Sequence, residues 1–174
     1  MSDIYKFWEY LKLLDDMIKA EQCFVCPPDK PLGDFIIADD GSISIEVRNS
    51  NIRFKDGFLL KYSEHATIII SDNKYTISKY SYHFEGRQNG LHSFRIDRDL
   101  NERPHANHEK YDKKWAHHLY YPDDIDFNIL SFCLPTMIRT SIQYTETKKY
   151  PLEKINADFY NRENNKIRGE IMWN

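Results

Sequence analysis

The sequence predicts a single α+β domain in which N-terminal and C-terminal helices pack on one face of a four- to five-stranded antiparallel sheet, a meander. Three observations support this: helix-spaced apolar residues near the N-terminus, alternating segments separated by turn signals, and helix-spaced apolar residues near the C-terminus. A chain of 174 residues suits one hydrophobic core. We divide it into an N-terminal helix with a proline connector, the sheet, a histidine-rich loop and a C-terminal helical part, at residues 1–41, 42–97, 98–124 and 125–174.

The first element is a predicted helix from about Asp3 to Glu21, with Ser2 as its N-cap. Apolar residues recur there at spacings of three and four, which gives one apolar face: Ile4, Phe7, Trp8, Leu11, Leu14 and Ile18. Three prolines then prevent the helix from continuing and predict a stiff connector: Pro27, Pro28 and Pro31.

The predicted sheet follows. Residues 42–54 alternate apolar and polar side chains, and Asp56-Gly57 is a strong hairpin signal. Further strands are expected at Phe58–Tyr62, Thr67–Ile70, Tyr75–Glu85 and Leu91–Asp97, with turns at 71–74 and 88–90. In the strand Tyr75–Glu85, alternation places Tyr80, Tyr82 and Phe84 on one face and Ser81 and His83 on the other.

Periodicity is lost between Arg98 and Asp124, which predicts a long loop of the kind that often carries function. Helical spacing resumes over Asp126–Tyr144, where Pro135 is expected to break or kink the helix. A short helix around Leu152–Asn161 is expected in the polar tail.

Composition narrows the function classes. The formal charge of −3 does not mark the whole chain as a nucleic-acid binder. No apolar run approaches the ~18 residues that span a bilayer, so we expect no membrane association. The three cysteines include one isolated C-x-x-C and follow no secretory signal, which favours reduced thiols and a cytoplasmic protein.

Candidate chemistry is concentrated between Lys79 and Tyr121. This stretch holds six of the seven histidines, together with Arg95 and Asp97: His83, His92, His105, His108, His117 and His118. Histidine is the side chain that titrates near neutral pH, and it is also the commonest metal ligand. Arg95 and Asp97 are two apart on a predicted strand, so they should share a face and could form a charge pair.

These residues resemble the TumE-type toxins of prokaryotic toxin-antitoxin systems over about residues 42–144. The likeness lies in a tyrosine-rich strand, an Arg-x-Asp strand end, a Pro-His, a histidine cluster and a following helix, here Tyr80–Phe84, Arg95–Asp97, Pro104-His105, His117-His118 and Asp126–Gln143. The resemblance implies a toxin in a toxin-antitoxin or related defence system, with a cognate antitoxin as partner. It is compatible with action on RNA.

The residues themselves can be assigned to a ribonuclease that needs no cofactor. His105 and either His117 or His118 would act as base and acid, Arg95 would hold the phosphate, and Asp97 would orient a histidine. Substrate contacts are assigned to Tyr80, Tyr82 and Arg98.

Two other classes stay open. The first is a metal-dependent nuclease or other hydrolase, with a divalent metal held by His105, His108, His117 or His118 and an oxygen donor from Asp97 or Glu109. The second is a binding module without chemistry that docks a protein or nucleic acid, with the Phe7-Trp8 face as docking element. A homodimer is compatible with each of these three functional classes.

Overall fold

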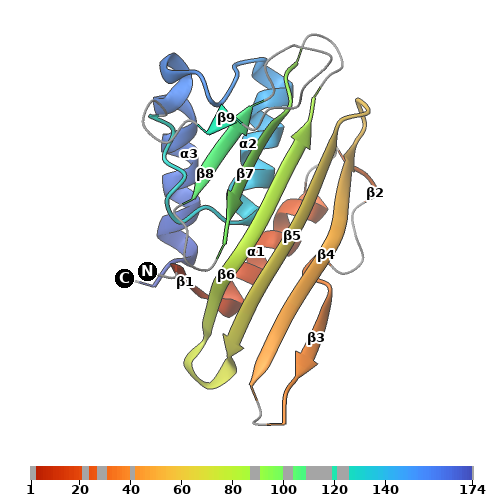
Figure 1. Ribbon diagram of the computed structural model, residues 1–174, viewed down its shortest axis with the longest axis vertical. Helices are drawn as coiled ribbons and strands as arrows, with labels where there is room; N and C mark the ends of the chain where they lie inside the picture. The colour runs from red at the N-terminus through yellow and green to blue at the C-terminus, as the bar shows by residue number, and fades with distance from the viewer. Residues whose placement is uncertain are drawn as a thin grey trace.

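The computed structural model describes residues 3–20, 24–26, 31–39, 42–86, 91–99, 104–108, 119–120 and 126–173. In these parts of the chain, nine strands form one antiparallel sheet and three α-helices lie on one side of it (Figure 1). The α+β fold in one domain is therefore confirmed, with a wider sheet than predicted. No helix in the described part is long and apolar enough to cross a membrane.

The sheet is built around three long strands. Its order is β2-β4-β5-β6-β7-β8-β9, while β1 pairs with β6 and β3 pairs with β4. The strands are β1 (Asp3–Lys6), β2 (Phe24–Cys26), β3 (Asp34–Ile37), β4 (Ile43–Phe54), β5 (Leu59–Ile69), β6 (Lys74–Glu85), β7 (Phe94–Arg98), β8 (His105–His108) and β9 (Leu119–Tyr120). The helices are α1 (Phe7–Ala20), α2 (Leu134–Thr147) and α3 (Ala157–Ile171), and η1 (Ile70–Asp72) and η2 (Lys154–Asn156) are single turns.

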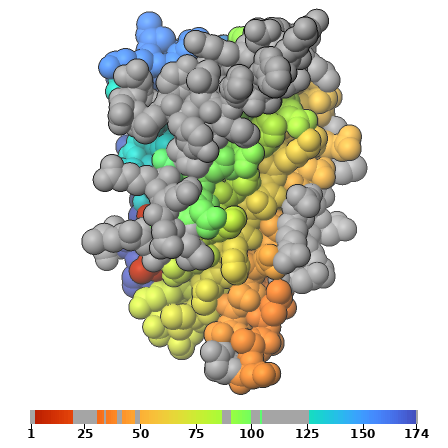
Figure 2. Space-filling view, in the orientation of Figure 1, coloured from red at the N-terminus to blue at the C-terminus, as the bar shows by residue number. Residues whose placement is uncertain are grey.

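The core lies between the sheet and the helices. Along β5 and β6 buried and more exposed side chains alternate, because successive residues of a strand point to opposite faces. The buried face is strongly aromatic; Tyr80 and Tyr82 stack with ring centroids 4.6 Å apart, and Phe84 packs against Phe94 at 5.4 Å. The opposite face of β5, β6 and β7 carries none of the described helices and faces the viewer in Figure 2, with α1 almost hidden behind it.

A buried carboxylate interrupts the apolar pattern of β5. Glu64 is 2% exposed, and its Oε1 accepts hydrogen bonds from the Tyr10 hydroxyl (2.9 Å), from the Tyr82 hydroxyl and from the backbone N–H of Leu134 (3.2 Å). Oε2 accepts from the Tyr75 hydroxyl at 2.9 Å. Because Glu64 takes an inward position, the predicted strands Phe58–Tyr62 and Thr67–Ile70 are in fact parts of the one strand β5.

The N-terminal prediction was wrong at its start. Residues from Asp3 to Lys6 form β1, which pairs with β6, and the helix begins only at Phe7, so Ser2 is not its N-cap. The first helical N–H groups are instead bound by Asn73, in the turn between β5 and β6. The Phe7 N–H donates to the Asn73 carbonyl (3.0 Å), and the Trp8 N–H donates to Asn73 Oδ1 (2.9 Å).

Asn73 should therefore contribute to stability through both its side chain and its backbone. It has φ +52°, a left-handed conformation that glycine and asparagine tolerate best. We expect Asn73→Ala to lower the free energy of unfolding by about 1–2 kcal/mol, because it loses a capping acceptor and strains the turn. Asn73→Gly keeps the conformation and loses only the cap, so urea denaturation should show a smaller loss; equal losses would contradict a role for the turn.

The region after β7 also differs from the prediction. The expected loop 98–124 contains β8, which pairs with β7, and β9, which pairs with β8. Pro135 lies in the first turn of α2, where its missing N–H costs nothing, and does not kink the helix. Helix α3 is longer than the short helix expected near Leu152. The predicted turn at 88–90 lies outside the described residues.

Candidate functional site

The candidate site is a row of polar side chains on the face of the sheet opposite to the described helices. Lys61 of β5 pairs with His83 of β6, and His83 pairs with Arg95 of β7. Directly paired residues of antiparallel strands share a face and lie close together. Three neighbouring strands therefore bring two cations to either side of one imidazole.

This row forms one side of a hollow. The hollow has a volume of about 410 Å³ and is lined by Asn51, Lys61, Tyr62, Ser63, Ser81, His83 and Arg95. Such a volume falls within the range of small-molecule sites, and the lining offers cationic donors and hydroxyl groups. It can accept an anion such as a phosphate group.

Arg95 and Asp97 form the predicted charge pair. Nε of Arg95 lies 2.8 Å from Oδ1 and 2.7 Å from Oδ2 of Asp97, and alternation along β7 puts both residues on the face opposite to the buried Phe94 and Ile96. The ion pair with Asp97 uses Nε of Arg95 and so fixes the plane of the guanidinium. It does not use the two terminal nitrogens of Arg95. A guanidinium held in this way is suited to binding a phosphate through two parallel hydrogen bonds.

His83 is half-buried between these charges. Burial lowers the pKa of His83 below its ordinary value of 6.5, and Arg95 and Lys61 act in the same direction, whereas Glu85 and Asp97 oppose them. His83 is therefore neutral at neutral pH, with one ring nitrogen able to accept a proton. That is the state required of a general base.

The predicted substrate contacts Tyr80 and Tyr82 are placed elsewhere. They are 2% and 0% exposed, and the Tyr82 hydroxyl is bound by Glu64 on the helix-covered side. Their rings fill the core, so they are not available to stack on a base. The alternation of the strand already puts them on the face opposite His83, so the predicted substrate role of Tyr80 and Tyr82 was wrong.

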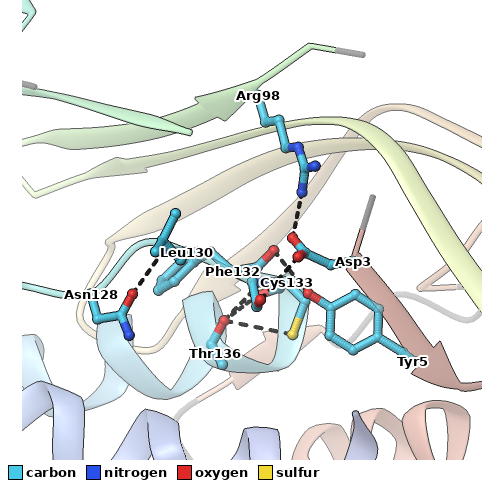
Figure 3. A network of polar contacts seen from close by, with 9 residues as sticks. Asp3, Tyr5, Arg98, Asn128, Leu130, Phe132, Cys133 and Thr136 are labelled. Atoms are coloured by element: carbon cyan, nitrogen blue, oxygen red, sulfur yellow. Dashed lines mark hydrogen bonds and ion pairs between the residues drawn. The ribbon is translucent and has the colours of Figure 1, made fainter. Parts of the chain in front are cut away.

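Arg98 is also directed into the core and away from the hollow. Figure 3 shows it extending from β7 to Asp3 of β1, with which it forms a largely buried ion pair. Asp3 in turn accepts a hydrogen bond from the Ser131 hydroxyl at 2.9 Å. The substrate role expected for Arg98 is therefore replaced by a structural one, because this pair ties the N-terminal strand to the sheet and to the segment before α2.

The predicted base and acid can be placed only in part. His105 pairs in register with Asp97, and Asn107 pairs with Arg95, so the backbone of β8 extends the polar row by one strand. Nothing further follows for the His105 side chain. His117 and His118 lie outside the described residues, and their roles stay predictions.

The metal alternative requires a group of ligands. In the described part of the chain, no three His, Cys, Asp or Glu side chains are grouped so that they could hold a metal ion. Three of its proposed ligands fall outside the residues that the structure describes, namely Glu109, His117 and His118. For that reason this hypothesis also stays a prediction.

Arg95 is the one residue lining the hollow that was also a predicted site residue; Lys61 and His83, which lie beside it, were not predicted. Lys61 and His83 are separated by 22 positions in the chain and become neighbours only through the pairing of β5 with β6. The available signal was the polar face of Tyr75–Glu85, on which His83 was already placed. None of the protein-family models, curated proteins or solved structures compared with the chain matches it.

Proposed function

We propose that the protein is the toxin component of a prokaryotic toxin-antitoxin or related defence system, and that it binds and cleaves RNA at the face of its sheet opposite to the described helices. The observation that carries the proposal is the hollow in which His83 lies between Lys61 and Arg95. This arrangement supplies a proton acceptor beside two donors for a phosphate. RNA and a cognate antitoxin are the partners of this proposal, and the cytoplasm is its setting.

In the proposed reaction His83 removes the proton of a ribose 2′-hydroxyl. The 2′-oxygen then attacks the adjacent phosphorus, the bond from phosphorus to the 5′-oxygen breaks, and an acid returns a proton to the leaving oxygen. The products are a 2′,3′-cyclic phosphate and a 5′-hydroxyl. Arg95 and Lys61 stabilise the additional negative charge on the phosphoryl oxygens. His105, which was predicted to act in the base and acid pair, is proposed as the acid; its strand position is paired with Asp97.

Arg95→Gln should lower the rate of RNA cleavage by about 10- to 100-fold, because it removes a cation that interacts with the transition state. The measurement is cleavage of a labelled single-stranded oligoribonucleotide in chelator, with analysis of the product ends. Lys79→Gln is the matched control: it removes the same charge from β6, where Lys79 is bound to Asp99 at 2.6 Å and does not line the hollow.

Cyclic phosphate ends, with the loss confined to Arg95→Gln, would support the proposal. A folded wild-type protein that leaves RNA intact with and without divalent metal would overturn it. Cleavage that requires added metal would instead favour the metal-dependent hydrolase, and growth arrest without RNA cleavage would favour a binding module.

A further inference from the structure

Glu85 lies beside the hollow and contacts two members of the polar row. It is two residues beyond His83 on β6 and therefore shares its face. Its Oε1 is 2.5 Å from Nζ of Lys61 and 3.9 Å from Nδ1 of His83. One carboxylate oxygen thus faces both the lysine and a specific nitrogen of the imidazole.

The contact with Lys61 orients the carboxylate. Lys61 comes from the neighbouring strand and donates to the same oxygen that faces His83, so the negative charge is held beside Nδ1. At 3.9 Å the interaction with the imidazole is electrostatic, since a hydrogen bond requires about 3.2 Å or less. A negative charge beside Nδ1 favours the proton on that nitrogen.

The other charges around His83 have partners of their own. Arg95 and Asp97 face the imidazole from β7 and are bound to one another, and Lys61 faces it from β5 while bound to Glu85. Glu85 is the residue whose carboxylate oxygen lies 3.9 Å from Nδ1. In a neutral imidazole one ring nitrogen carries the proton and the other is the acceptor, so a proton on Nδ1 leaves Nε2 as the acceptor.

We infer that Glu85, oriented by Lys61, is a positioning residue that holds the proton of neutral His83 on Nδ1 and leaves Nε2 as the proton acceptor. The use of Nε2 in catalysis rests on the proposed function. The inference about the tautomer rests on the geometry of Glu85, Lys61 and His83. The two can be tested separately.

The experiment is nitrogen NMR of the full chain labelled with ¹⁵N-histidine, in which the His83 signals are assigned by their loss in His83→Gln. In the wild type at pH 8 we expect the Nδ1–H tautomer to predominate. Glu85→Gln removes the charge and keeps the size, so it should shift His83 toward the Nε2–H tautomer and move its titration midpoint to lower pH. Glu85→Asp keeps the charge and should retain part of the wild-type signature.

Asp99→Asn is the matched control, because it removes a carboxylate that binds Lys79 on the same sheet, away from His83. It should leave the His83 signals unchanged. A wild-type His83 in the Nε2–H form, or signals that Glu85→Gln does not move, would overturn the inference even if RNA cleavage requires His83. A tautomer shift in a protein that cleaves no RNA would support the positioning role and overturn the proposed function alone.

Discussion

Glu64→Leu is expected to lower the free energy of unfolding by roughly 3–5 kcal/mol, because four buried donors lose their acceptor and each unsatisfied buried group costs about 1 kcal/mol or more. Leucine fills the space of the side chain but offers no acceptor. The hydroxyls of Tyr10, Tyr75 and Tyr82 and the N–H of Leu134 would then lose the oxygen atoms that they share. Each of these groups is buried, so water cannot replace the lost acceptor.

The measurement is urea denaturation followed by circular dichroism, with Tyr75→Phe as the control variant. This change removes a single donor and leaves the carboxylate its other partners, so it should cost about 1 kcal/mol. If Glu64→Leu costs no more than Tyr75→Phe, the carboxylate does not organise the network, and the contact between β5 and the start of α2 depends on apolar packing alone.

Glu64→Gln should cost less than Glu64→Leu and should also change the pH dependence. Burial raises the pKa of Glu64 above its ordinary value of 4.5, although the hydrogen bonds from Tyr82, Tyr75, Tyr10 and Leu134 lower it in part. The folded state therefore binds this proton more tightly than the unfolded state. The stabilisation from protonation is complete below about pH 4.5 and is lost as pH rises through the folded pKa. The stability of the wild type relative to Glu64→Gln should accordingly fall as pH rises above 4.5.

The sheet was predictable where local rules act alone. Asp56-Gly57 forms the expected hairpin turn, with Gly57 at φ +83°, and β6 spans the strand predicted at Tyr75–Glu85. The shared face of Arg95 and Asp97 follows from the period of a strand, and their ion pair confirms it. These features depend on residues close together in the chain.

Features that depend on distant partners were missed. Residues from Asp3 to Lys6 continue the helical spacing of the next segment, yet they form β1 because β6 offers them an edge. Residues from His105 to His108 show no alternation of apolar residues, yet they form β8 because the edge of β7 is available for pairing. In the sequence Glu64 looks like a polar interruption of the strand β5. The groups that bind its carboxylate come from α1, β6 and α2, which are distant in the chain. These contacts between distant segments cannot be inferred from the spacing of residues in the sequence.

The candidate site was predicted in part for the same reason. Arg95 and Asp97 were recognised from their spacing. The histidine cluster drew the assignment toward His105, His117 and His118, whereas the described hollow contains His83. Tyr80 and Tyr82 were assigned a substrate role from their residue type, although the alternation of β6 directs them into the core. The same alternation places His83 on the face opposite to Tyr80 and Tyr82, beside Arg95, and so favours His83 as the site residue of β6.

His83→Gln is expected to reduce RNA cleavage by about 10²- to 10⁴-fold, the range for loss of a general base, while leaving the folded state intact. His83 lies at the surface of the hollow, and glutamine is similar in size and polar. Thermal unfolding should therefore change little. A loss of cleavage together with a large fall in the unfolding temperature would assign His83 a structural role instead.

The pH–rate profile provides the sharper test of His83, because burial gives its pKa shift a definite direction. A base must be deprotonated, so the rate should rise with pH through the pKa of His83 and then level off. Burial, with Arg95 and Lys61, places this pKa below 6.5, and so the rising limb should lie at more acidic pH than for an ordinary histidine. Arg95→Gln removes one of the charges that lower the pKa and should move the limb toward higher pH. A limb that stays in place would mean that the titrating base is another residue, with His105 the first to substitute.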